Sequence, residues 1–272
     1  MKTFPVLDPG LLGQVGRGFC ALAVMTKAPQ AGLVKTRLVP LLTPDEAAEL
    51  NRSFLRDTAA AISNACCRRP VGDAASKSLP LQESASHREA ATTRAMGIAV
   101  YTPVGSEPLY TDILPNNYSL FPQRGEKFGE RLYFAAEDLF KCGFDSVCLI
   151  DSDSPTVPAE NFATAVELLN TSDDRVVLGP CEDGGYYLIG LTKPHRELFE
   201  QIDWSTERVF DQTMRRAREI GLEVKLLPPG YDVDDAASLR RLCNELLCDN
   251  VRADIAPNTR KFVRELIAQK KL

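Results

Sequence analysis

Residues 146–155 read SVCLIDSDSP, in which an apolar run leads directly into two aspartates, Asp151 and Asp153. A strand that is apolar on both faces is typical of the centre of a parallel sheet covered by helices on either side. Residues 19–25 and 175–179 form two more runs of this kind, and residues 158–170 have a helical pattern. Strands and helices that alternate at this spacing indicate right-handed crossover units. The sequence therefore predicts an α/β fold with a single, mostly parallel, mixed central sheet and helices on both faces.

The remaining elements are predicted on either side of this stretch. Residues 186–191 follow a short loop, so we expect that strand to run antiparallel. Further strands are predicted at 98–102, 118–122 and 223–227, and helices at 44–67, 128–142, 206–220 and 235–247. Residues 69–96 are rich in Ser, Ala and charge without an apolar period, which predicts a surface insertion. We expect an N-terminal extension over 1–18, one domain over 19–250 and a C-terminal helix over 251–272 that packs on it.

Composition and charge narrow the class of protein. The chain has 272 residues, a formal net charge of −5 and a pI near 5.3. These values argue against a general affinity for nucleic acid or anionic membranes, because both require a basic face. No apolar run approaches the roughly 20 residues that span a bilayer, and no export signal is visible, so we expect a cytoplasmic protein without a membrane span. The oligomeric state stays open.

Cysteine and histidine usage points away from disulfides and zinc. The eight cysteines are scattered, most of them within apolar segments, and there is no C-x-x-C pair. We interpret them as reduced, mostly buried thiols. Only two histidines occur, so a structural zinc site is not expected.

Two pairs of aspartates follow predicted strands: Asp151 with Asp153, and Asp232 with Asp234. Residues two apart in an extended chain share a face, so each pair can point into the crevice beyond the carboxyl ends of the strands, where ligands of parallel sheets bind. Carboxylate oxygens suit Mg²⁺ or Mn²⁺. An alternative remains open for both pairs, because Asp153 and Asp234 could instead cap the helices that follow them or be solvated turn residues.

The loop after the first strand, residues 27–37, is basic. It brings Lys27, Lys35 and Arg37 together with a flexible Gly32. Backbone amides and basic side chains in such a loop can surround a phosphate. The loop matches neither the P-loop nor the G-x-G-x-x-G pattern, and a solvated basic loop is the alternative. Residues 125–131 form a second glycine-containing loop that opens a predicted helix. The start of this helix could offer amides to an anion, although surface charge is the default interpretation.

A third loop, residues 182–187, has the sequence EDGGYY and follows a buried strand. Its adjacent glycines would let the backbone approach a ligand, on which the tyrosines could stack. A tight hairpin with Tyr in the core fits these residues equally well. Trp204 is the only tryptophan of the chain and precedes a predicted helix, which Ser205 or Thr206 is expected to cap.

Six blocks, taken in order, carry a family resemblance. They are KAPQAGLVKTRL, GEKFGERL, LIDSDSPTVP, LGPCEDGGYYLIGL, WSTERVFDQT and LLPPGYDVDD. Together they extend over residues 21–242 and resemble the bacterial family DUF2064, also named radical-SAM/selenodomain-associated transferase, first type. This family is similar to compact nucleotide-diphospho-sugar transferases of the glycosyltransferase A fold, whose relatives include small nucleotidyltransferases.

The resemblance implies roles for several of the residues above. It implies a nucleotide near the basic loop, and a metal at Asp153 with Asp232 or Asp234 as partner. Many relatives have Gly where this chain has Asp151, which makes Asp153 the safer ligand. Gly184 and Gly185 would border the acceptor side.

The leading hypothesis is a transferase dependent on Mg²⁺ or Mn²⁺ that moves a sugar from a nucleotide-diphospho-sugar to a small-molecule acceptor. Lys35 and Arg37 would stabilise the departing diphosphate, and Glu182 or Asp183 would act as general base in an inverting reaction. One alternative is a nucleotidyltransferase that uses a nucleoside triphosphate and a phosphorylated small molecule, although its typical G-G-x-G-x-R loop is absent. Another alternative is a non-catalytic nucleotide-binding protein.

The predicted site residues fall into four groups. The catalytic residues are Lys35, Arg37, Asp153 and Asp183. The nucleotide-binding residues are Lys27, Ala28, Pro29, Gly32, Lys35 and Arg37. The acceptor-binding residues are Glu182, Gly184, Gly185, Tyr186, Trp204 and Ser205, and the metal ligands are Asp151, Asp153, Asp232 and Asp234.

Overall fold

The fold is seen in a computed structural model, which describes residues 2–11, 13–39, 41–67, 94–171, 173–248, 250–269 and 271. Most of the predicted insertion, residues 69–93, lies outside the described residues. No helix among those described is long and apolar enough to cross a membrane.

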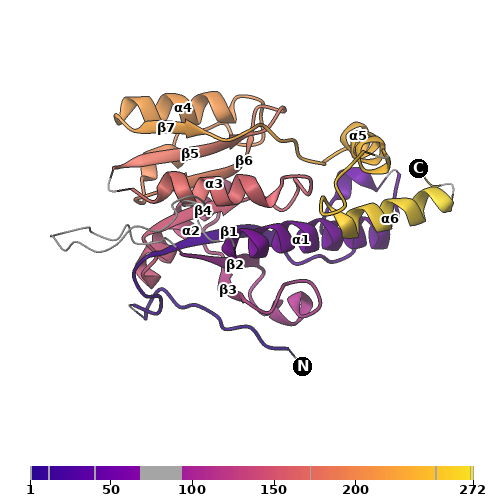
Figure 1. Cartoon of the computed structure of the whole chain (residues 1–272), viewed down its shortest axis with the longest axis horizontal. Helices are drawn as coiled ribbons and strands as arrows, with labels where there is room; N and C mark the ends of the chain where they lie inside the picture. Colours follow the sequence, from indigo (N-terminus) through magenta and orange to yellow (C-terminus); the bar gives the residue numbers. More distant parts are fainter. Residues whose placement is uncertain are drawn as a thin grey trace, which may run out of the picture.

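A seven-stranded mixed sheet forms the centre of the molecule (Figure 1). Its strands are β1 (Phe19–Lys27), β2 (Arg94–Thr102), β3 (Tyr118–Pro122), β4 (Ser146–Ile150), β5 (Arg175–Pro180), β6 (Tyr186–Leu191) and β7 (Glu223–Leu226). Their order is β3-β2-β1-β4-β6-β5-β7, and only β6 runs antiparallel to its neighbours. This confirms the predicted fold class and the antiparallel direction of residues 186–191.

Helices cover both faces of the sheet. The helices are α1 (Pro44–Cys67), α2 (Phe128–Cys142), α3 (Ala159–Leu169), α4 (Val209–Glu219), α5 (Ala236–Leu247) and α6 (Pro257–Ala268). Side chains of α1 and α3 pack against Cys20, Leu22 and Val24 of β1 on one face. On the other face, α2 and α4 pack over Ala21 and Ala23. Because β1 buries both of its faces, its sequence is a continuous apolar run rather than an alternating one.

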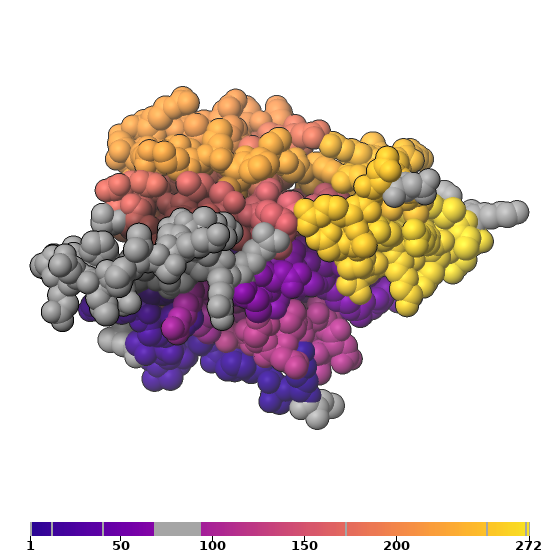
Figure 2. Space-filling model, in the orientation of Figure 1, coloured from indigo at the N-terminus to yellow at the C-terminus, as the bar shows by residue number. Residues whose placement is uncertain are grey.

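The last two helices form one end of the molecule with the start of α1, as Figure 2 shows. The N-terminus of α6 has no cap from its own chain segment, since the N-cap position is Ala256. Instead the buried carboxylate of Asp57, on α1, accepts hydrogen bonds from the amides of Asn258 at 3.0 Å and Thr259 at 2.8 Å. An anion at this position satisfies free amides and complements the helix dipole, so it fixes α6 on α1.

Several boundaries differ from the sequence prediction, among them the start of the C-terminal helix, which is Pro257 rather than residue 251. Strand β2 begins at Arg94, so the last residues of the predicted insertion are strand. Helix α4 begins only at Val209, because Thr206 accepts a hydrogen bond from the Arg208 amide at 3.3 Å and forms a turn before the helix. The N-terminal extension is in part structured: Leu7 donates to Leu120 of β3 at 2.9 Å, and Leu120 donates to Pro5 at 2.8 Å.

Candidate active site

Two cavities lie side by side at the carboxyl ends of β1 and β4. The first has a volume of about 360 Å³ and lies between the basic loop and α2. The second has a volume of about 540 Å³ and extends toward the loops that contain Asp183 and Trp204. Asp153, Asp234 and Arg37 line both, so these residues mark the boundary between the two cavities. This is the edge of a parallel sheet at which ligands bind in such folds.

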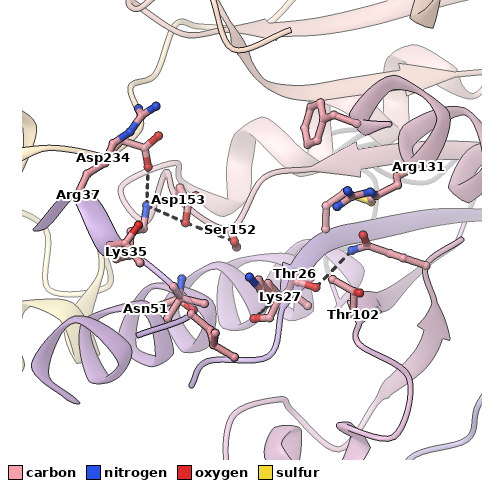
Figure 3. Close-up of a pocket in the computed structure, with 16 residues that line it drawn as sticks. Thr26, Lys27, Lys35, Arg37, Asn51, Thr102, Arg131, Ser152, Asp153 and Asp234 are labelled. Carbon is pink, nitrogen blue, oxygen red and sulfur yellow. Dashed lines mark hydrogen bonds and ion pairs between the residues drawn. The ribbon is translucent and has the colours of Figure 1, made fainter. Parts of the chain in front are cut away.

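A buried ammonium group joins the two aspartates at this boundary (Figure 3). Lys35 Nζ lies 2.9 Å from Asp153 Oδ1 and 2.8 Å from Asp234 Oδ1, and it donates to the Val233 carbonyl at 2.7 Å. Three acceptors match the three protons of an ammonium group. Burial lowers the pKa of Lys35, but the charges of Asp153 and Asp234 outweigh this effect and raise the pKa above its ordinary value. Lys35 is therefore a fixed positive charge.

The backbone of Lys35 supports this placement. Its φ of 48° lies in the left-handed region, which side chains other than Gly rarely adopt. The conformation costs about 1 kcal/mol or more, and it persists where surrounding contacts determine it. Here the contacts are the two ion pairs and the packing of the Lys35 ammonium against the Phe54 ring at 5.4 Å. Strain of this kind is typical of functional loops.

Asp151 and Asp153 occupy different environments, although the sequence predicts a symmetric pair. The chain bends after Ile150, so the alternation of an extended strand ends there. The Ser154 hydroxyl donates to Asp151 Oδ2 at 2.7 Å. Burial, and next the charge of Asp153, raise the pKa of Asp151 well above its ordinary value. One oxygen of Asp151 is thus already bound by Ser154, whereas the Asp153 side chain is 34% exposed to the cleft, which makes Asp153 the better-placed candidate ligand.

The capping roles considered for Asp153 and Asp234 are wrong. Helix α3 has Pro158 at its N-cap and no side-chain cap, so Asp153 does not cap it. Helix α5 is capped by Asp235, whose Oδ1 accepts from the Ser238 amide at 2.8 Å. The capping position is thus one residue beyond the predicted one, which leaves the Asp234 carboxylate free to bind Lys35.

The second aspartate pair lies beside the first, as the predicted metal site requires. The Val233 amide donates to the Asp153 carbonyl at 3.0 Å, which ties the two loops together. Burial raises the pKa of Asp234, but Lys35 outweighs it and the pKa is lowered. Burial, and then the charges of Asp183 and Asp234, raise the pKa of Asp232 to about 6.

The protein itself supplies only part of the ligands that Mg²⁺ or Mn²⁺ requires. Within the described ranges, no group of three or more His, Cys, Asp or Glu side chains is arranged to hold a metal ion. Asp153 and Asp234 supply two carboxylates, and Mg²⁺ is commonly held by one or two carboxylates together with substrate phosphates and water. The residues thus fit a metal that arrives with a phosphate-bearing substrate. Such an ion would compete with Lys35 for the same oxygens.

The first cavity has a basic lining. Lys27, Lys35 and Arg37 all contribute to it, as predicted, and Figure 3 shows Arg131 of α2 on the side opposite Lys35. Arg131 lies in the first turn of α2, within the stretch 125–131 whose charges we interpreted as surface charge. Its role in the cavity depends on the packing of α2 and is invisible in the local sequence.

Asn51 of α1 also lines the first cavity, and no sequence motif pointed to it. It is buried, and its Oδ1 has no hydrogen-bond partner in the structure. A buried amide oxygen without a partner costs free energy, and this one lies at the cavity, where a ligand could donate to it.

Three predicted nucleotide-binding residues build the basic loop without lining the cavity. The Ala28 amide donates to the Thr102 carbonyl at 2.8 Å, and the Pro29 carbonyl accepts from Arg52 at 3.0 Å. Gly32 has a φ of +74° in a tight turn that needs this conformation. They hold the loop so that Lys35 and Arg37 reach the cleft.

Only some of the predicted acceptor-binding residues line the second cavity. Gly185, Tyr186, Trp204 and Ser205 line the second cavity together with Asp183. Glu182 does not line either cavity, because Arg241 holds it in a two-point ion pair at 2.6 and 2.7 Å. Gly184 has a φ of +89° and lies against the Glu207 backbone, which leaves no room for a Cβ atom.

The EDGGYY loop is both a hairpin and a wall of the cavity. It connects the antiparallel strands β5 and β6, and the Cys181 amide donates to the Gly185 carbonyl at 3.0 Å. Tyr187 is buried in the core, whereas Tyr186 lines the second cavity. The hairpin interpretation is therefore confirmed, with Tyr187 in the core, and the stacking of Tyr186 on a ligand stays a prediction.

Packing fixes the indole ring of Trp204. Its ring meets Phe128 edge to face, with centroids 5.1 Å apart. A Cβ atom at Gly129 would lie 2.5 Å from Trp204 Nε1 and 2.7 Å from the Phe199 carbonyl oxygen. The start of α2 therefore needs Gly at this position. Ser205 has a φ of 65° and caps no helix, contrary to our leading interpretation.

Residues 87–206 match the model of a family described as "Uncharacterized protein conserved in bacteria (DUF2064)". This match confirms the family resemblance predicted from the six blocks. A search of curated proteins finds no match to the chain.

Two solved structures illustrate the fold. The chain is similar to a candidate nucleotide-diphospho-sugar transferase from Desulfovibrio desulfuricans G20, with 27% sequence identity, a TM-score of 0.72 and coverage of 94% of this chain and 96% of that chain. It is also similar to a nucleotidyl transferase from Methanothermobacter thermautotrophicus, with 11% identity, a TM-score of 0.52 and coverage of 84% and 96%. The predicted nucleotide-diphospho-sugar transferase-like fold is confirmed.

Proposed function

Because residues 87–206 match the DUF2064 family model and the fold is that of nucleotide-diphospho-sugar transferases, we propose that the chain is a transferase that uses a nucleotide-activated donor. The donor would occupy the first cavity and a small acceptor the second, with sugar transfer from a nucleotide-diphospho-sugar as the reaction. The observation that carries this proposal is the boundary between the cavities, where Lys35, Asp153 and Asp234 meet. A group that crosses from one cavity to the other must pass these side chains.

The basic side chains of the first cavity suit a diphosphate. Lys27, Lys35, Arg37 and Arg131 line it. Negative charge builds up on the diphosphate as it leaves, and fixed cations stabilise that charge without reorganisation. Lys35 is already held in place and Arg37 reaches both cavities, so these two residues lie nearest to the bond that would break.

Asp153 and Asp234 would hold a divalent metal ion together with the phosphates of the donor. When bound, the ion would neutralise charge on the diphosphate leaving group. Asp183 is our proposed general base, because it lines the second cavity and, among the described residues, its carboxylate accepts a hydrogen bond only from the Gly185 amide, at 2.9 Å. Its carboxylate would take a proton from the acceptor hydroxyl.

Donor turnover tests the proposal. We would incubate the protein with a panel of nucleotide-diphospho-sugars and nucleoside triphosphates, with Mg²⁺ or Mn²⁺, and measure the release of nucleoside diphosphate or pyrophosphate. Release of nucleoside diphosphate from a sugar donor supports sugar transfer, whereas release of pyrophosphate supports nucleotidyl transfer. Asp153→Asn should reduce turnover at least a hundredfold, in the range of a lost transition-state contact.

The matched control is Asp173→Asn, which removes an exposed aspartate that pairs with Arg175 at 3.2 Å, before β5 and outside both cavities. It should retain full turnover. If Asp153→Asn is as active as this control, or if no donor binds with either metal, the proposed function is wrong.

A further inference from the structure

The second cavity differs in charge from the first. Its lining contains six carboxyl groups, and Arg37 is its one cation among the described residues. The six are Asp151, Asp153, Asp183, Glu207, Asp232 and Asp234. The first cavity, by contrast, is lined by two lysines and two arginines.

Four of these carboxyl groups, Asp151 among them, have no counter-charge within the described chain. Lys35 pairs with Asp153 and Asp234, but no Lys, Arg or His of the described chain lies within 4.0 Å of Asp183, Glu207 or Asp232. Elsewhere in the described chain only about half of the carboxylates form an ion pair, as Glu182 does with Arg241. The second cavity differs because several unpaired carboxylates line one concave surface. Unpaired charges of one sign that line a concave surface attract a ligand of opposite charge.

Aromatic rings form the wall that faces these carboxylates. Trp204, Phe128 and Tyr186 line the cavity, together with Leu132. Trp204 is held by Phe128 and by the absence of a side chain at Gly129, so its ring is fixed before a ligand arrives. Rings placed in this way bind flat apolar groups and attract cations to their faces.

We propose that the second cavity selects an acceptor that carries a positively charged amine and no phosphate, with its apolar part against Trp204. This inference rests on the proposed function, since it names the acceptor class of the same site. A phosphorylated acceptor would place its phosphate beside the unpaired carboxylates of the second cavity. The repulsion between these negative charges would oppose binding. The opposite charges of the two cavities would direct the phosphate-bearing donor to the first and the amine to the second.

Trp204 gives a direct readout of this site. It is the only tryptophan in the chain and it lines the second cavity, so its fluorescence reports binding there without any need for turnover. We would titrate the protein with benzylamine, benzyl alcohol and benzyl phosphate, which share a ring and differ in charge. Benzylamine should bind at least fivefold more tightly than benzyl alcohol, and benzyl phosphate should bind most weakly.

Charge-removing variants identify the source of the preference. Asp183→Asn and Glu207→Gln, alone and combined, should reduce the preference for benzylamine over benzyl alcohol to less than twofold in the double variant. The control Asp173→Asn should keep the full preference. High salt should weaken benzylamine binding and leave benzyl alcohol unaffected, because screening acts only on the charged probe.

Three results would overturn the inference. They are binding of benzyl phosphate at least as tight as that of benzylamine, an unchanged preference in the double variant, and no saturable change of Trp204 emission with any probe. Nucleoside diphosphate binding, measured by calorimetry with ADP, GDP, CDP and UDP, reports on the proposed function separately. If the protein binds one of these nucleotides and prefers benzyl phosphate, the proposed transferase function stands and the proposed amine-bearing acceptor is wrong.

Discussion

At the scale of single residues, the centre of the site is an ammonium group shared by two carboxylates. The Lys35 side chain is 4% exposed, whereas Asp153 and Asp234 are 34% and 46% exposed. The lysine is therefore enclosed, while each aspartate still presents an edge to the cleft. This arrangement suits a site in which the carboxylates later share their charge with a metal or a substrate.

Replacing the ammonium group tests its contribution to stability. Lys35→Met leaves two neighbouring carboxylates without their cation, so we expect a loss of about 1–3 kcal/mol in unfolding free energy. This is less than for a fully buried pair, because water can reach both aspartates. Urea denaturation would measure it, and Mg²⁺ should stabilise Lys35→Met more than the unchanged protein.

Lys141→Met provides the control, because Lys141 also contacts two carboxylates, Glu137 at 2.7 Å and Asp138 at 3.1 Å, but its own side chain is 46% exposed. It should lose less than about 1 kcal/mol. Equal losses in the two variants would mean that the enclosed position of Lys35 has no special importance.

Asn51 allows a test in which stability and binding move in opposite directions. Asn51→Leu removes a buried oxygen that has no partner, which should raise the unfolding free energy by about 1 kcal/mol. The same change removes a hydrogen-bonding group from the first cavity, so donor affinity should fall roughly tenfold, the effect of one lost polar contact. Thermal unfolding and donor calorimetry measure the two effects.

Asn64→Leu, at an exposed position of the same helix, is the control and should leave donor affinity unchanged. If Asn51→Leu destabilises the protein and binds donor normally, the amide has a structural role only.

At the scale of elements, helix α2 positions the second cavity through its first turn. Gly129 lies against Trp204 and the Phe199 carbonyl, and Phe128 meets the indole ring. A substitution in this turn is therefore expected to shift Trp204, which lines the second cavity.

Gly129→Ala should move Trp204. The added methyl group has no space, so we expect a loss of about 1–3 kcal/mol, typical of overpacking, and a shifted Trp204 emission maximum. Gly16→Ala is the control, because a Cβ there would meet no atom within 4 Å. An unchanged emission spectrum in Gly129→Ala would show that the ring is not held by this contact.

Much of the fold could be predicted from the sequence because its signals are local. The buried strands, the helix end at Gly143 and the antiparallel strand at 186–191 follow from apolar runs, turn residues and loop length. Asp234 and Asp235 show the limit: both are carboxylates after a strand, and only the backbone geometry decides which one caps α5.

The site was predictable in position but not in detail. The basic loop and the aspartate pairs lie together as expected, since the carboxyl ends of parallel strands meet at one edge. The neutral tendency of Asp151 comes from burial and from the charge of Asp153, which no spacing rule includes. Arg131 and Asn51 enter the cavity from helices whose packing depends on residues distant in sequence.

At the scale of the whole molecule, the C-terminal helices support the cleft. Helices α5 and α6 share a hydrophobic cluster with Leu38, which directly follows the basic loop, and with Val233, which lies between Asp232 and Asp234. The cluster therefore holds Lys35 and Asp234 from behind. We therefore expect a loss of α6 packing to loosen the positions of Lys35 and Asp234.

Asp57→Ala tests this coupling. Removing the carboxylate leaves the first amides of α6 without a partner, so we expect a loss of about 1–3 kcal/mol. Hydrogen exchange should accelerate first in α6 and next in residues 231–235. The exposed Asp45, in the first turn of α1, supplies the control Asp45→Ala, which should leave exchange in α6 unchanged. Exchange confined to α6 would mean that the cleft is independent of this end.

The pairing of residues 5–7 with Leu120 affects the molecule as a whole. Strand β3 lies at one edge of the sheet and β7 at the other. The N-terminal segment occupies the outward-facing hydrogen-bonding groups of Leu120, and β7 is short and carries Glu223 and Lys225. Short or charged edges and covered edges both discourage the addition of a foreign strand. The N-terminal segment thus covers the middle of the β3 edge at Leu120, and the β7 edge is short and charged. Both features make strand-by-strand growth into larger aggregates less favourable.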